Sequence, residues 1–276
     1  MADLGSRLCD SGLGIPIGDV IIPGVFFADD MVIGALSDAD FQALLDITGQ
    51  FGRERDLKFS SEKSKVLSHG EGIDTDRTWV LQGQILVGEQ LGQMECEEVE
   101  EEEVVISEAK EYSYLGVGLT LYGSLFGYAA KKLVQKAKKA RGMIIGIAKS
   151  SLCFAGVAQE LWVKVGLMTI LYGAEVFSLN SEQIAKLENV QRQMARDITR
   201  APKGTAIQAM YGELGWKDMK HHLAEAKIRY FGRLQLLNEQ AWCKQVFQAS
   251  MELGNEGYHT SWWKDIQWYC SSYNFE

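Results

Sequence analysis

Residues 25–33 read VFFADDMVI, and this stretch decides how the front of the chain folds. Two apolar runs flank the adjacent aspartates Asp29 and Asp30, a pattern that predicts a tight β-hairpin with both carboxylates at its tip. The choice of residues is unusual, because the two central residues of such a turn need positive φ and favour Asn-Gly or Asp-Gly. Two like charges beside apolar side chains also repel each other.

Two interpretations of this acidic tip stay open. A divalent cation such as Mg²⁺ would relieve the repulsion, because hard cations prefer carboxylate oxygens and bridge them to substrate phosphates. A solvent-exposed turn without a ligand explains the same residues, since short motifs also occur by chance. The segments further along the chain have to decide between the two.

The segments that follow predict one helix and several short strands. Ser37 and Asp40 have the spacing of a capping box, and apolar residues then recur at helical spacing to a predicted end near Arg55. A strand is expected over residues 57–67, and shorter strands at residues 78–81, 84–87, 104–106 and 112–119. The run from Glu95 to Glu103 holds seven glutamates and predicts a solvated loop, because clustered like charges resist burial.

From residue 127 onward the pattern is helical. Helices are expected over residues 131–149 and 158–177, from a cap at Asn180 or Ser181 to a turn at residues 201–204, and over residues 219–238. The fold class is therefore α+β. Antiparallel strands with a packed helix form the first domain, residues 1–122, and an all-α bundle forms the second, residues 123–276.

Composition excludes several classes of protein. The five cysteines are scattered without a CxxC pair, which argues against a disulfide framework and a structural zinc site. No signal peptide is apparent, and Lys164 and Glu175 interrupt the most apolar stretch, residues 161–179. The protein is therefore expected to be intracellular, in the nucleus or cytoplasm, and to have no membrane partner.

The two halves of the chain differ in charge. Residues 1–130 hold 8 Lys and Arg against 24 Asp and Glu, a net charge of -16, whereas residues 131–276 hold 20 against 13, a net charge of +7. Six basic residues of the second half form a cluster with no acid between them: Lys131, Lys132, Lys136, Lys138, Lys139 and Arg141. The cluster predicts contact with a nucleic-acid backbone, although a solvated helix face explains it as well.

A second basic stripe points to structure rather than to binding. Arg192, Arg196 and Arg200 recur at four-residue spacing, but Glu188 and Asp197 dilute their charge. A solvated helix face is the favoured interpretation here.

Several short motifs occur in a fixed order along the chain. Phe27-Ala28-Asp29-Asp30 is followed by LKFSSEKSK at residues 57–65, with Lys63, and by YSYLGV at residues 112–117. LYGAE at residues 171–175, KLE at residues 186–188 and GELGW at residues 212–216 come next. In its motifs and their order the chain resembles the reverse transcriptases of LINE-type (non-LTR) retrotransposons, from the catalytic hairpin of the palm through the thumb and the helical region after it.

The resemblance implies an RNA-directed DNA polymerase that adds dNTPs to a DNA primer on an RNA template. Asp29 would be the main ligand of catalytic Mg²⁺, with Asp30 beside it, and Lys63 would lie near the incoming triphosphate as a proton donor. Tyr114, Leu115 and Gly116 would support the primer end. The first domain would be a partial palm, and the basic cluster of the second domain would belong to a thumb that contacts nucleic acid.

The chain departs from the family pattern in one important respect. In the family, a second metal-binding aspartate and the fingers precede the hairpin, and neither has a counterpart here. We therefore expect no polymerase activity from this chain by itself, because part of the two-metal site is missing. The alternative is a non-catalytic protein, derived from a retroelement, that binds nucleic acid or acts as a helical interaction module.

Overall fold

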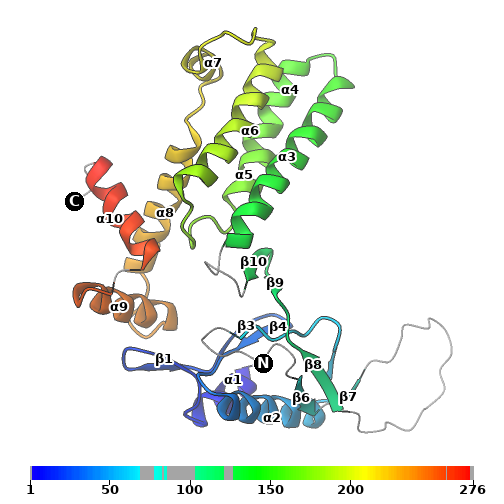
Figure 1. Ribbon diagram of the computed structural model, residues 1–276, viewed down its shortest axis with the longest axis vertical. Helices are drawn as coiled ribbons and strands as arrows, with labels where there is room; N and C mark the ends of the chain where they lie inside the picture. Colours follow the sequence, from blue (N-terminus) through cyan, green and yellow to red (C-terminus); the bar gives the residue numbers. More distant parts are fainter. Residues whose placement is uncertain are drawn as a thin grey trace, which may run out of the picture. The chain divides into compact units, whose positions relative to one another are not determined.

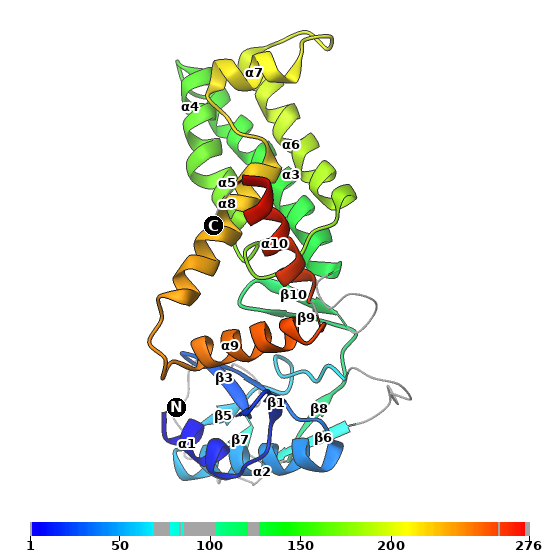
Figure 2. The same ribbon diagram turned by 90° about the vertical axis from the view of Figure 1, so that its left-hand side faces the viewer.

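A computed structural model describes residues 2–68, 78–82, 84–85, 103–120, 127–258 and 260–273. The chain divides into two compact units, each described here by itself. The first, called the strand unit, comprises Met1–Tyr112 and Gln245–Leu253; the second, called the helical unit, comprises Ser113–Lys244 and Gly254–Glu276. The fold is thus of mixed α and β type, with small sheets that are mainly antiparallel (Figures 1 and 2).

Two helices open the strand unit, α1 (Ala2–Asp10) and α2 (Asp38–Glu54). The predicted start and end of α2 are confirmed. The Ser37 hydroxyl oxygen accepts a hydrogen bond from the Asp40 backbone N–H at 3.1 Å and so satisfies one of the unpaired donors of the first turn. At the other end the helix closes at Arg55. Helix α1 has no counterpart among the sequence-based expectations.

The strands of this unit form two-stranded sheets. Three pairs are antiparallel: β1 (Ile15–Ile17) with β2 (Val20–Ile22), β3 (Gly24–Phe27) with β4 (Asp30–Ile33), and β6 (Thr78–Gln82) with β8 (Glu103–Ser107). A short parallel pair joins β5 (Lys58–Phe59) to β7 (Gln84–Ile85). The β1–β2 hairpin was not expected, and the predicted loop at Glu95–Glu103 falls mostly outside the described residues.

The predicted strand over residues 57–67 is wrong. Only Lys58–Phe59 is extended and paired, and Val66 makes an isolated bridge to Glu108. Between them the chain turns, because the Ser64 N–H donates to the Ser60 carbonyl at 2.9 Å. The Ser60 hydroxyl also accepts from the Lys63 N–H at 3.4 Å, and serine side chains of this kind favour turns over strands.

Helix α2 lies against two apolar clusters of the strand unit. On one side Leu44 and Phe51 pack with Leu4 and Leu8 of α1. On the other side Leu45 packs with residues of β6 and β8, where the ring of Phe41 meets Trp79 edge-on at 4.9 Å between centroids. One helix thus fixes both the β3–β4 hairpin, which borders the first cluster, and the β6–β8 pair.

The helical unit begins with a hairpin and continues as helices. Its elements are β9 (Glu111–Tyr114, shared with the strand unit), β10 (Val117–Thr120), α3 (Gly127–Lys149), α4 (Phe154–Leu161), a π-helical turn η1 (Trp162–Gly166), α5 (Leu167–Leu171), α6 (Ser181–Thr199), α7 (Ile207–Leu214), α8 (Met219–Gln235), α9 (Trp242–Asn255, shared in the same way) and α10 (Ser261–Tyr273). Contacts group the β9–β10 turn with the helices, whereas the sequence places it in the first domain.

The predicted helix over residues 158–177 has different bounds. The helical run covers Phe154–Leu171 and contains the π-turn η1, and Gly173 with φ = 74° follows its end. Glycine adopts this backbone conformation without steric cost, which explains the early stop. Among the described residues this run is long and apolar enough to cross a membrane, a test that core helices of soluble proteins also pass.

Helix α6 is central to the packing of the helical unit. Its start is a capping box, in which the Asn180 side chain accepts from the Gln183 N–H and the Gln183 side chain accepts from the Asn180 N–H. Leu187, Met194 and Ile198 lie on its apolar face and are buried. They belong to one large core that includes residues of α3, η1, α5 and α7.

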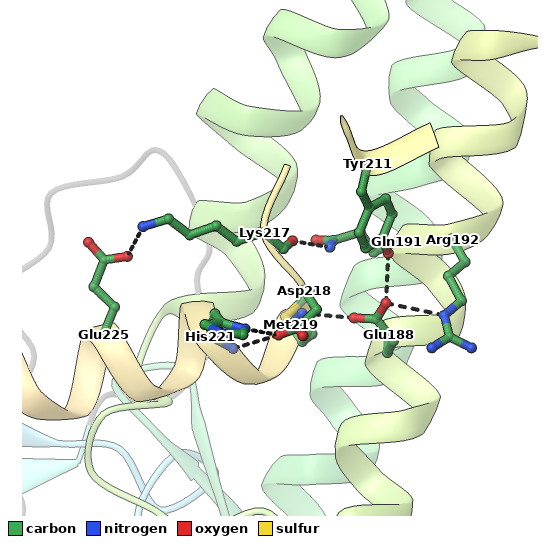
Figure 3. Close-up of polar contacts among 9 residues, drawn as sticks. All are labelled: Glu188, Gln191, Arg192, Tyr211, Lys217, Asp218, Met219, His221 and Glu225. Atoms are coloured by element: carbon green, nitrogen blue, oxygen red, sulfur yellow. Dashed lines mark hydrogen bonds and ion pairs between the residues drawn. The ribbon is translucent and has the colours of Figure 1, made fainter. Parts of the chain in front are cut away.

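A buried carboxylate joins α6 to the two helices that follow it (Figure 3). Glu188, 8% exposed, accepts hydrogen bonds from the Tyr211 hydroxyl and from the Met219 backbone N–H, each at 2.7 Å. Burial, and then the hydrogen bond to Glu188, raise the pKa of the Tyr211 hydroxyl. One turn further along, the Gln191 side-chain N–H donates to the Lys217 carbonyl at 2.8 Å, so that α6 fixes the start of α8.

Candidate nucleic-acid interface

The acidic motif forms the predicted tight hairpin, but in a shifted register. Phe27 pairs with Asp30, so the two residues of the turn are Ala28 and Asp29, and Asp30 begins β4. The expectation that both aspartates occupy the turn is therefore wrong. Phe26 pairs with Met31 and both border the α1–α2 cluster; a shift by one residue would turn them away from it.

The register places the strained position on Ala28, whose φ is 54°. A non-glycine residue with positive φ is uncommon and costs about 1–2 kcal/mol, so the surrounding contacts hold the turn against its local preference. Phe27, next to it, is 62% exposed. Strain at a tip of this kind is a feature that often accompanies ligand sites.

Asp29 and Asp30 are both exposed, and neither carboxylate makes a hydrogen bond or ion pair with another described residue. Nor does any group of three or more His, Cys, Asp and Glu suited to a metal ion occur in the part of the chain that the structure describes. Two neighbouring carboxylates still fit Mg²⁺ in one common arrangement, in which the protein supplies one or two carboxylates and a substrate supplies phosphate oxygens.

Lys63 lies in the turn after β5 and is exposed. Its backbone carbonyl accepts a hydrogen bond from the Tyr112 hydroxyl at 3.0 Å, which links the turn to β9. Within the described residues, no hydrogen bond or ion pair connects its ammonium group to Asp29 or Asp30. The structure thus places Lys63 at an accessible position without joining it to the acidic tip.

A second tight turn, Leu115–Gly116, connects β9 to β10, with Tyr114 as the last residue of β9. Both turn residues have positive φ, 46° for Leu115 and 79° for Gly116, as a type I′ turn requires. Each carbonyl of the turn accepts a hydrogen bond from a side chain of the helical unit. The Tyr172 hydroxyl donates to the Leu115 carbonyl at 2.9 Å, and the Lys136 ammonium donates to the Gly116 carbonyl at 3.0 Å.

The glycine after Tyr172 also contacts this hairpin. A Cβ on Gly173 would lie 2.9 Å from the Val117 Cγ2 atom, closer than a side-chain carbon tolerates without a shift. The YLGV and LYGAE motifs, separate in the sequence, thus meet around one turn. Tyr172 and Gly173 belong to the LYGAE motif, but the sequence predicted no role for them. A glycine that interrupts an apolar helix was the available signal.

The structure separates the basic cluster into two groups. Lys136 binds the turn, and the Lys132 ammonium lies 4.4 Å from the centroid of the Tyr128 ring. Lys131, Lys138 and Lys139 are exposed on α3 and make no ion pair with any described residue. These three are called the outward lysines below.

Arg141 differs from the lysines. Its guanidinium forms two hydrogen bonds to Asp197 Oδ2 on α6, at 2.8 and 2.5 Å. The expectation that no acid neutralises the cluster is therefore wrong for this residue, because α6 packs against α3 and carries its own acid there. Arg141 joins the two helices and is not available to a ligand in this arrangement.

The second arginine stripe makes contacts with residues of the helical unit, whereas the sequence predicted a solvated helix face. Arg192 pairs with Glu188 at 3.2 Å, and Arg196 donates to the Pro202 carbonyl at 2.8 Å. Arg200 is the left-handed C-cap of α6 and lies 5.9 Å from the centroid of the Phe154 ring. These arginines close the end of α6.

Helix α3 carries the outward lysines and packs against the β9–β10 hairpin, whose turn is held by a lysine and a tyrosine. The strand unit adds a bare acidic tip that suits a divalent cation. No family model, curated protein or solved structure matches the chain.

Proposed function

We propose that this chain is the catalytic hairpin of the palm, the primer-grip hairpin and the thumb of a LINE-type reverse transcriptase. The observation that carries the proposal is the Leu115–Gly116 turn. Two motifs that resemble that family, YSYLGV at residues 112–117 and LYGAE at residues 171–175, make contacts around this one turn, and Lys136 of α3 binds it as well. A chance likeness of short motifs gives no reason for them to meet.

In this proposal the helical unit binds the RNA template and DNA primer. The outward lysines contact the phosphates, because three unpaired cations on one helix attract a polyanion and release its counterions. The hairpin, with Tyr114, Leu115 and Gly116, supports the primer end. Lys132 and Lys136 act on the hairpin rather than on phosphate, since both already contact residues beside it or in it.

The acidic tip has a separate role in the proposal. Asp29 and Asp30 would hold Mg²⁺, which supplies Lewis-acid polarisation of phosphoryl oxygens when bound. Lys63, exposed after β5, would donate a proton or a positive charge to the triphosphate of the incoming dNTP. Two adjacent carboxylates are only part of a two-metal site, so the proposal assigns nucleic-acid binding, and not polymerisation, to this chain by itself.

Binding of a fluorescent RNA–DNA duplex at several salt concentrations tests the proposal. We expect the wild-type affinity to fall steeply with salt, and the variant K131Q/K138Q/K139Q to lower the slope of log K against log salt by about 2 to 3. The control K164Q/K186Q/K203Q removes the same charge from other exposed lysines of the helical unit. Equal effects of the two variants, or no binding at low salt, would contradict the proposal.

A second assay examines the acidic tip. We expect no templated dNTP incorporation by the purified chain with Mg²⁺. Incorporation that Asp29→Ala abolishes would overturn the statement that this chain does not polymerise, while it would support the family assignment.

A further inference from the structure

Residues 172–178 lie between α5 and α6 and contact the hairpin at one end and α10 at the other. This segment is called the bracket below. At its first end, the Tyr172 hydroxyl and Gly173 contact Leu115 and Val117 of the hairpin, as described above. All of these residues lie in the helical unit.

The middle of the bracket is anchored in the core. Ala174 and Phe177 are almost fully buried and belong to the same apolar cluster as residues of α3 and α6. The bracket is therefore a packed connection, and not a loose loop, so displacement at one end is transmitted to the other by close packing.

The second end of the bracket is held by α10. The Trp262 indole N–H donates to the Glu175 carbonyl at 2.7 Å, and its ring meets Tyr230 of α8 edge-on at 6.2 Å. Lys227 of α8, 2% exposed, donates to the Ser178 hydroxyl at 3.4 Å and forms an ion pair with Asp265 of α10. Helix α10 packs against α8, and the two helices together supply these contacts to the bracket (Figure 2).

The ion pair holds a buried charge in place. Burial lowers the pKa of the Lys227 ammonium, and the hydrogen bond and charge of Asp265 oppose that shift. Removal of the Asp265 carboxylate would leave a buried cation without its charge partner, which is costly and would drive α8, α10 or the bracket to rearrange.

We infer that α10 is a positioning element for the primer-grip hairpin, acting through the bracket, with Trp262 and Asp265 as its positioning residues. The inference rests on the proposed function for what the hairpin binds, but the mechanical connection stands on the contacts alone. Neither residue touches the hairpin. Each fixes the position of the bracket. The bracket in turn fixes the positions of the Leu115 carbonyl and Val117 through Tyr172 and Gly173.

The test compares two identical substitutions in α10. Trp262→Phe keeps an aromatic ring against Tyr230 and removes the N–H that binds Glu175. Trp268→Phe is the matched control, because Trp268 lies on the same helix, and its indole N–H makes no hydrogen bond to a described residue. Asp265→Asn is a second variant that changes the other contact, and circular dichroism establishes that each variant is folded.

The first readout is the amide signals of Gly116 and Val117 in NMR spectra, with their hydrogen-exchange rates. We expect Trp262→Phe and Asp265→Asn to shift these signals and to raise their exchange rates, and Trp268→Phe to leave both unchanged. Unchanged signals in the two folded variants, or equal changes in the control, would overturn the inference. This readout needs no nucleic acid.

The second readout is binding of the RNA–DNA duplex. We expect Trp262→Phe to weaken binding by about threefold to tenfold with the salt slope unchanged, because the phosphate-binding lysines stay in place. A lower slope would mean that α10 acts on the lysines and would overturn the inference. If the amide signals respond while the wild-type chain binds no duplex, the proposed function fails and the positioning role of α10 stands.

Discussion

Two tight hairpins of this protein, β3–β4 and β9–β10, solve the same backbone problem in different ways. Each places a bulky or methyl-bearing residue at positive φ in the first position of a two-residue turn, Ala28 in one and Leu115 in the other. The Leu115–Gly116 turn is held by two side-chain hydrogen bonds, one from Lys136 of α3 and one from Tyr172 after α5. The Ala28–Asp29 turn has no such support among the described residues, and its strain is balanced only by the pairing and packing of its strands.

The contacts distinguish a turn that is fixed by its neighbours from a turn whose side chains remain open to a ligand. A turn whose carbonyls are already bound has a fixed position and little capacity left for a ligand, so it serves to place what lies beside it. A turn with exposed carboxylates and no partner keeps its whole binding capacity. Variants that add support to one turn, or remove it from the other, test this distinction.

The largest effect is expected at Gly173. Gly173→Ala adds a Cβ at positive φ and within 2.9 Å of Val117, so we expect it to destabilise the helical unit by about 2–4 kcal/mol. Gly215→Ala is the control, because Gly215 also has positive φ, 65°, but no described atom lies within 4 Å of its added Cβ. Chemical denaturation gives the free energy of unfolding of each variant, and the difference between the two losses measures the contribution of the hairpin contact. Equal losses would show that the contact is unimportant.

A smaller effect is expected when the hydrogen bond to the Leu115 carbonyl is removed. Tyr172→Phe removes one hydrogen bond, and we expect a loss of about 0.5–1 kcal/mol, because the freed carbonyl is exposed enough to bind water. Lys136→Met removes the other hydrogen bond at Gly116 and should act similarly. A double-mutant cycle shows whether the two supports act independently; a strong coupling would indicate that the turn moves as one body.

The opposite sign is expected at the unsupported turn. Ala28→Gly relieves the positive φ, and we expect a gain of about 0.5–1 kcal/mol in the strand unit, after the entropy that glycine adds to the unfolded chain. Thermal unfolding, followed by a signal from the strand unit, measures this change in stability. A loss of stability would mean that the Ala28 methyl group makes contacts that outweigh the strain.

The smallest effect on stability is expected at Asp29. Asp29→Asn should change the free energy of unfolding by no more than about 0.5 kcal/mol, because the side chain is exposed and unpaired within the described residues. The same variant should weaken Mg²⁺ binding at the tip, measured as the Mg²⁺-dependent shift of the Ala28 and Asp30 amide signals. Identical titrations of wild type and variant would remove the metal interpretation of this turn.

Local features of the fold were predictable from the sequence, and distant pairings were not. The cap at Ser37 and the capping box at Asn180 depend on neighbouring residues, so a short window contains all the information. Arg141–Asp197 and Glu188–Tyr211 join residues on different helices, which no short window shows. Of the candidate site, the sequence indicated the acidic hairpin and the basic cluster as a whole. It predicted one strand over residues 112–119, where the structure has the Leu115–Gly116 turn, and the division of the basic cluster follows from how α3 packs against β10 and α6.

Two errors have the same physical origin. The strand expected over residues 57–67 is interrupted by serine-based turns, and the register of the acidic hairpin follows the packing of Phe26 and Met31 rather than the preference of the turn residues. In both cases hydrophobic alternation was visible in the sequence. What was not visible is which contact prevails when two local preferences compete.

The extra residue of the π-helical turn η1 changes the orientation of the residues that follow it. A π-turn holds one more residue than the α-helical turn it replaces, and here the Trp162 ring covers Gly166 so closely that a Cβ would lie 2.5 Å away. Every residue after η1 is therefore rotated by about 100° relative to an uninterrupted helix. Deletion of one residue within η1 should regularise the helix and carry Tyr172 away from Leu115, so the extra residue of this turn keeps the β9–β10 hairpin in phase with its support.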